Sequence, residues 1–161
     1  MLDAGAFASM SVELDHGEIV RMAPANMPHT LALDSVLMSL KAAIRETERA
    51  FGEPALVLPD DTVREPDVCV FDGAVVRERI ATAALARIVV EVSDTTLSYD
   101  LGTKALDYAA AGIPEYWVVD LAAKSTHVMC EPTPDGYASR KIVAFGEPVT
   151  SSRLREPVIV G

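Results

Sequence analysis

The chain has 161 residues, of which 50% are hydrophobic and 24% charged, so it carries enough apolar side chains for a buried core. This composition excludes a disordered tail, a collagen-like repeat and a disulfide-stapled miniprotein. A formal net charge of −10 argues against nucleic-acid binding through a broad basic face.

The first half of the chain predicts a hairpin, one helix and three short strands. Residues 11–22 alternate between apolar and polar types around Gly17, which is typical of a β-hairpin. In residues 29–50 apolar side chains recur at three- and four-residue steps, which predicts one helix that ends before Gly52 and Pro54. Short strands bounded by prolines are then expected at Ala55–Leu58, Thr62–Arg64 and Asp67–Phe71.

The second half begins with a weak pattern at residues 74–86, which is helical or irregular. The apolar run Arg87–Val92 predicts a central strand covered on both faces. A helix at Ser98–Ala111 and a buried strand at Glu115–Leu121 follow, which together predict a right-handed parallel crossover. The remaining strands are expected at Thr126–Cys130, Tyr137–Ile142 and Val158–Val160.

This element order predicts an α/β (α+β) fold, with a mixed β-sheet flanked by helices and an N-terminal β-hairpin. We predict a single domain over residues 1–161, with a core at about 12–130 and C-terminal strands at 131–161. The two cysteines, Cys69 and Cys130, are predicted to be buried free thiols.

The N-terminal sequence lacks the basic start and apolar run of a signal peptide. No stretch approaches the ~18–20 apolar residues that a membrane span requires. Together these features predict a cytoplasmic protein without a membrane partner.

Two acidic residues occupy strands that are otherwise apolar. Asp67 begins a strand directly after Pro66, and Glu91 interrupts the run Arg87–Val92. A buried carboxylate without a partner is costly, so Glu91 requires a cation, a lysine or solvent at a cleft. If the two strands are neighbours, both carboxylates converge on one point, and such oxygen ligands suit Mg²⁺.

Lys104 lies on the helix that follows Glu91, with Asp100 one turn before it on the same face. Ser93, two residues after Glu91, returns to the same side of the strand. A divalent cation at this point would polarise a phosphodiester oxygen and acidify a bound water. An ammonium group beside it would orient that water or stabilise the developing negative charge.

Three strings carry a family resemblance: VELDHGEIVRMAP followed by His29, VREPDVCV at 63–70, and IVVEVSDTTLSYDLGTKALDYAAAGIPEYWVVD at 88–120. They resemble the Uma-two family of restriction endonucleases, within the PD-(D/E)xK nuclease superfamily, over roughly residues 12–130. The resemblance implies a restriction-endonuclease-like αβββαβ core that hydrolyses DNA phosphodiester bonds with Mg²⁺, or with Mn²⁺ in its place.

The resemblance also implies the residues of the site. Asp67 matches the acid of the Pro-Asp pair and Glu91 the acid of the second half-motif, and both would hold the metal. The chain departs from the plain motif because Ser93 stands where the superfamily has lysine. In this family the lysine lies on the following helix, which makes Lys104 the third catalytic residue.

Five further residues are candidates for a supporting role. The hairpin of this family supplies an acid, and both Glu13 and Glu18 fit, so the choice stays open. His29 matches a histidine at the start of the first helix and is either part of the cleft or a helix cap. Asp100 either supports the site or is a solvated charge near the start of a helix, and Ser93 is either a hydrogen-bonding group of the site or a local cap.

No functional role is predicted for the remaining aromatic and histidine residues considered next. Tyr116 and Trp117 are expected to fill the core or a subunit interface, and His16 and His127 have no partner at ligand spacing. The chain has no phosphate-binding glycine loop, nucleophile elbow, HExxH sequence or dinucleotide fingerprint.

The leading hypothesis is therefore a metal-dependent endodeoxyribonuclease that acts as a homodimer. The alternative is a catalytically inactive nuclease-fold module for protein interaction or nucleic-acid binding, which the acidic charge and the missing in-strand lysine favour. A third possibility is a nuclease whose protein partner supplies the basic surface.

Overall fold

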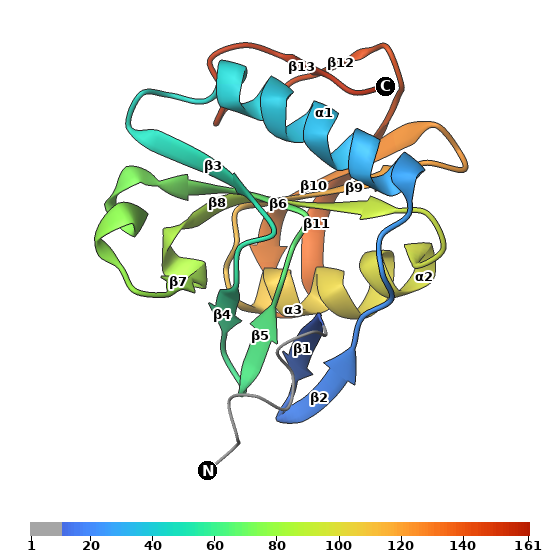
Figure 1. Cartoon of the computed structure of the whole chain (residues 1–161). Coiled ribbons are helices and arrows are strands. Elements are labelled where there is room, and N and C mark those ends of the chain that lie inside the picture. Colours follow the sequence, from blue (N-terminus) through green and yellow to red (C-terminus); the bar gives the residue numbers. More distant parts are fainter. Residues whose placement is uncertain (1–10) are drawn as a thin grey trace.

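The computed structural model describes residues 11–161 and forms a mixed α+β fold (Figure 1). It has one six-stranded sheet, one five-stranded sheet and a two-stranded pair. The predicted mixed architecture is confirmed. The prediction that the chain has no signal peptide concerns mainly residues 1–10, and these lie outside the described residues. Within residues 11–161, no helix has the length and apolar character needed to cross a membrane.

The six-stranded sheet has the order β11-β10-β9-β8-β6-β3. All neighbouring strands in it are antiparallel except β8 and β9, which are parallel and joined through helical turns, as the sequence predicts. Its strands are β3 (Glu48–Gly52), β6 (Val68–Asp72), β8 (Ala86–Ser93), β9 (Glu115–Asp120), β10 (Ser125–Thr133) and β11 (Gly136–Ala144). The connection from β8 to β9 contains α2 (Leu97–Tyr99), the π-helical segment η3 (Asp100–Lys104) and α3 (Ala105–Ala110).

The five-stranded sheet contains the N-terminal hairpin and has the order β2-β1-β5-β4-β7. Its strands are β1 (Val12–Asp15), β2 (Glu18–Arg21), β4 (Leu56–Leu58), β5 (Thr62–Arg64) and β7 (Ala81–Thr82). Two 3₁₀ turns, η1 (Gly73–Arg77) and η2 (Ala83–Leu85), fill the segment whose sequence pattern is weak. The hairpin joins the other strands of this sheet through the pairing of β1 with β5.

Helix α1 (Met27–Ala43) is shorter than the sequence predicts. Asn26 caps its first turn by accepting a hydrogen bond from the His29 N–H. The expectation of a helix over 29–50 is wrong in its last part, because Glu48–Gly52 forms β3 and pairs with β6. Ala50 is buried opposite Val70, so strand pairing outweighs the helical periodicity of this segment.

Helices cover both faces of the six-stranded sheet, α1 on one and α3 on the other (Figure 1). Along β8, Val90 and Val92 pack in the cluster with α1, whereas Val89 packs in the cluster with α3. This double cover explains the continuous apolar runs of β8 and β9. The buried positions of Tyr116 and Trp117 are confirmed.

Both cysteines are free thiols, as predicted. Cys69 is buried in the sheet, whereas Cys130 is only half-buried, so the prediction of a buried thiol is wrong for Cys130.

The C-terminal segment packs against α1 and adds the pair β12 (Pro148–Val149) and β13 (Val158–Ile159). The Arg155 N–H donates to the Ala43 carbonyl at 2.8 Å, and its guanidinium donates to the carbonyls of Ala42 and Ile44. These bonds satisfy carbonyls that the end of a helix leaves without partners.

Candidate active site

The strand register brings Asp67 and Glu91 side by side. β6 and β8 are antiparallel with Val68 opposite Val90, so Asp67, one residue earlier, lies across from Glu91. Side chains alternate along a strand, and both acids therefore point to the α3 face of the sheet. Both residues are buried, at 9% and 4% exposure. The predicted adjacency of the two strands is confirmed.

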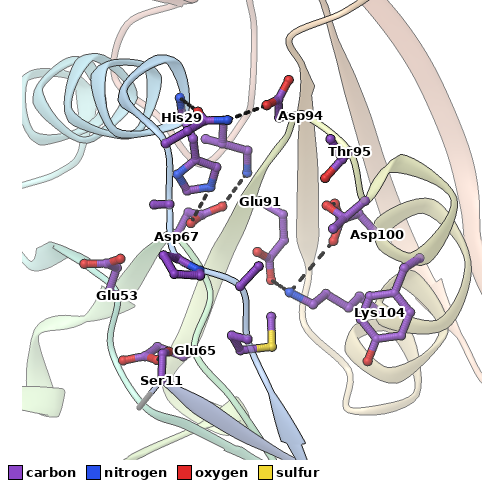
Figure 2. Close-up of a pocket in the computed structure, with 18 residues that line it drawn as sticks. Ser11, His29, Glu53, Glu65, Asp67, Glu91, Asp94, Thr95, Asp100 and Lys104 are labelled. Atoms are coloured by element: carbon purple, nitrogen blue, oxygen red, sulfur yellow. Dashed lines mark hydrogen bonds and ion pairs between the residues drawn. The ribbon is translucent and has the colours of Figure 1, made fainter. Parts of the chain in front are cut away.

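A pocket of about 240 Å³ opens beside these acids (Figure 2). Five of the residues singled out from the sequence line it, namely His29, Asp67, Glu91, Asp100 and Lys104. Its wall also carries the acidic side chains of Glu53, Glu65 and Asp94. The pocket is thus strongly acidic, and Lys104 is the one lysine that lines it among the described residues.

Lys104 places a buried ammonium group among three carboxylates. Its Nζ lies 3.0 Å from Glu91 Oε1, 3.7 Å from Glu13 Oε1 and 3.8 Å from Asp100 Oδ1. Burial acts to lower the pKa of Lys104, but the surrounding negative charges outweigh it and raise the pKa above its usual value. Lys104 therefore carries a positive charge at neutral pH.

The two oxygens of Glu91 have different surroundings. Oε1 accepts a hydrogen bond from the Tyr108 hydroxyl at 2.7 Å and faces Lys104. Oε2 accepts no hydrogen bond from any group in residues 11–161. Burial, together with the negative charge of Asp67, raises the pKa of Glu91 to about 8 despite the nearby Lys104. The carboxylate form would gain from one more positive charge in the pocket.

Asp67 is fixed by two donors from different elements. Its Oδ2 accepts a hydrogen bond from the Val92 N–H at 2.6 Å, and its Oδ1 lies 3.1 Å from His29 Nε2. The hydrogen bond with Asp67 raises the pKa of His29, while burial opposes the rise. His29 thus reaches the pocket from the first turn of α1 and does more than cap that helix.

Replacing His29 with glutamine is expected to destabilise the protein more at low pH than at high pH. Because the pKa of His29 is raised above its ordinary 6.5, the folded protein holds the proton more tightly than the unfolded chain. This stabilisation is complete below about pH 6.5 and is lost as the pH rises through the folded-state pKa. Denaturant unfolding of both proteins across this range measures it, and a difference that is constant with pH contradicts it.

The hairpin acid Glu13 lies beside the site, whereas Glu18 does not. Glu13 is 2% exposed; its Oε1 accepts from the Glu65 N–H at 2.9 Å and its Oε2 from Arg64 at 3.1 Å. It does not line the pocket but faces Lys104. Glu18 is exposed on β2 and lies outside the pocket lining.

Ser93 and Asp100 are joined through Thr96. The Thr96 hydroxyl donates to Asp100 Oδ2 at 2.6 Å and lies 3.5 Å from Ser93 Oγ. Asp100 lines the pocket, and burial raises its pKa. Ser93 is buried behind the lining and reaches the site only through these neighbours.

Arg64 forms a second charge network beside the site, and sequence reasoning missed it. Its side chain is fully buried and donates to Asp15 at 2.8 Å, to the Tyr99 hydroxyl at 2.8 Å, and to Glu13 and Asp107. The network joins β1, β5, α2 and α3. Arg64 stands in a strand that alternates in burial, but only the three-dimensional fold identifies its partners.

Tyr108 was also missed, although the sequence holds a signal for it. It lies four residues after Lys104, so both side chains point from one helical face toward Glu91.

A second group of ligand-type side chains forms where the hairpin turn meets α3. Asp15, His16 and Asp107 offer ligand atoms that all lie within 4.8 Å of one another, as a metal site would require. No partner at ligand spacing was expected for His16, but folding brings Asp107 Oδ1 to 3.3 Å from its Nε2. Arg64 already contacts both carboxylates and balances their charge.

The described fold is similar to that of a crystal structure described as a "putative nuclease belonging to DUF820" from Anabaena variabilis ATCC 29413. The TM-score is 0.64 at 17% sequence identity, and the match covers 86% of this chain and 78% of the other. The chain therefore shares its fold with that protein.

The sequence model of the Uma2 family, described as "Putative restriction endonuclease", matches residues 6–156. The chain belongs to this family, which confirms the resemblance found in the sequence. No curated protein matches the chain.

Proposed function

We propose that this protein is a Mg²⁺-dependent endonuclease that hydrolyses phosphodiester bonds in DNA, with Mn²⁺ as a substitute. The observation that carries the proposal is the pair of buried acids, Asp67 and Glu91, on adjacent strands of one pocket beside Lys104. Membership of a family described as restriction endonucleases supports the same reaction class.

The side chains present fit a hard divalent cation. Mg²⁺ prefers oxygen ligands and is commonly held by one or two carboxylates while it keeps several waters. Asp67 and Glu91 would hold it, and Glu91 Oε2 offers an oxygen that no described group occupies. When bound, such an ion lowers the pKa of a coordinated water and polarises a phosphodiester oxygen.

Lys104 supplies a fixed positive charge in the same pocket. We assign it the role of orienting the attacking water or of stabilising the negative charge that develops on the phosphate. It replaces the lysine that the motif places at the position of Ser93, because its Nζ reaches Glu91 from the neighbouring helix. His29 and Asp100 would support the site by holding Asp67 and Lys104.

The acidic wall of the pocket gives a second candidate function some support. Glu53, Glu65 and Asp94 would repel a phosphate backbone, and the chain has a net charge of −10. A nuclease-fold module that binds a protein partner and cleaves nothing also fits these charges. The two candidates differ in whether a divalent cation makes the pocket competent to cut DNA.

The deciding experiment incubates the purified chain with supercoiled plasmid and with linear duplex in the presence of Mg²⁺, Mn²⁺ or EDTA. The proposal expects nicked or linear products with either metal and none with EDTA. Calorimetric titration with Mn²⁺ alone, without DNA, separates the candidates further. If the chain shows no cleavage and binds no Mn²⁺ at millimolar metal, the non-catalytic module is the better explanation.

The proposal includes a cytoplasmic homodimer. Two identical sites related by a two-fold axis are the simplest way to cut both strands of a duplex.

A further inference from the structure

Three buried tyrosines pack behind the pocket, each from a different element. The ring centroids of Tyr108 of α3 and Tyr116 of β9 are 4.9 Å apart, and the two rings are tilted relative to each other. Tyr116 in turn stacks on Tyr137 of β11 at 6.1 Å. The exposure of Tyr108 and Tyr116 is 0%, so neither ring has room to move.

The hydroxyl groups of these tyrosines have different partners. Tyr116 donates to the Asp100 carbonyl at 3.0 Å, and Tyr137 donates to the Ile113 carbonyl at 2.9 Å. Tyr108 alone of the three donates to a carboxylate, Glu91 Oε1 at 2.7 Å. Burial raises the pKa of Tyr108 well above its ordinary value, so its hydroxyl keeps the proton that it donates.

We propose that Tyr108 is a positioning residue that holds Glu91 Oε1 and thereby turns Oε2 toward the pocket to receive the cation. Two donors, Tyr108 and Lys104, occupy the same oxygen from successive turns of one helical segment. A carboxylate fixed at one oxygen leaves the other available in a defined direction. This inference rests on the proposed function, since it assigns Glu91 to the metal.

The hydrogen bond holds a proposed metal ligand from behind the pocket, at 2.7 Å from the Tyr108 hydroxyl to Glu91 Oε1. Groups that hydrogen-bond metal ligands commonly change metal affinity 10–100-fold when removed. Phenylalanine would fill the same space as Tyr108, so the hydroxyl is what the site adds to simple packing.

The test compares Tyr108→Phe with Tyr116→Phe in the full chain. Both variants delete one buried hydroxyl from the same stack, but only Tyr108 donates to Glu91. We expect Tyr108→Phe to weaken Mn²⁺ binding by about 10–100-fold in calorimetric titration, and Tyr116→Phe to leave it close to wild type. Cleavage by Tyr108→Phe should recover at saturating Mn²⁺, because the loss lies in metal affinity.

Thermal melts without metal separate positioning from stability, since both variants should lower the melting temperature by similar amounts. Unchanged Mn²⁺ affinity in Tyr108→Phe, or an equal loss in Tyr116→Phe, overturns the inference while leaving the proposed function intact. A wild-type chain that binds no Mn²⁺ overturns the proposed function and this inference with it. A Tyr108→Phe chain that is unfolded without metal overturns the inference as well, because the hydroxyl would then serve the fold.

Discussion

Asp67→Asn and Glu91→Gln are each expected to lower DNA cleavage by at least about 100-fold and to weaken Mn²⁺ binding. A bound metal contributes several kcal/mol of charge stabilisation to the transition state, and each ~1.4 kcal/mol corresponds to a tenfold change in rate. Both substitutions keep the shape of the side chain and remove its negative charge. Initial cleavage rates on plasmid DNA and calorimetric titration with Mn²⁺ measure the two effects.

Asp34→Ala serves as the control, because Asp34 is an exposed acid on α1 outside the pocket. It changes the net charge by the same amount as either active-site variant and should cut DNA like wild type. Equal cleavage by wild type and both active-site variants would remove Asp67 and Glu91 from the mechanism. A crystal soaked in Mn²⁺ adds a direct check, with anomalous density expected beside these two residues.

Arg64→Ala is expected to lower the free energy of unfolding by about 3–5 kcal/mol, the usual loss when one member of a buried ion network is removed. The substitution leaves the carboxylates of Glu13, Asp15 and Asp107 close together without their shared cation. Urea denaturation of wild type and variant at the same pH measures the loss.

Arg87→Ala is the matched control, because Arg87 pairs with a single acid, Asp72, and both side chains are partly solvated. Solvated pairs of this kind contribute little to stability. The variant should therefore unfold at nearly the same urea concentration as wild type. A loss in Arg87→Ala as large as that in Arg64→Ala would show that burial of the network is not what makes Arg64 important.

The sequence predicted the strands that carry the site better than it predicted the first helix. Glu91 could be singled out because it interrupts an apolar run, and such runs report burial directly. Residues 48–50 kept the helical spacing of α1, yet they pair with β6 in the sheet. Local periodicity contains no information on that pairing, which is set by a partner strand about twenty residues away.

The residues around the site were harder to predict from the sequence than its central residues. Lys104 could be inferred because it follows Glu91 on the next helix, and its contact with Glu91 is local in the chain. Arg64 could not, because its four partners come from segments far apart in sequence. The catalytic and metal-binding roles of Asp67, Glu91 and Lys104 stay predictions, as does the single-domain organisation.

The contact of Glu13 with Arg64 and Lys104 has a consequence for biogenesis. Fifty-one positions separate Glu13 from Arg64, and Lys104 lies still further along the chain. Such high-contact-order interactions form late, after much of the loop entropy between them has been lost. A nascent chain that has not yet reached Lys104, or a fragment clipped within the hairpin, therefore lacks these contacts, which form only once all three segments have folded together.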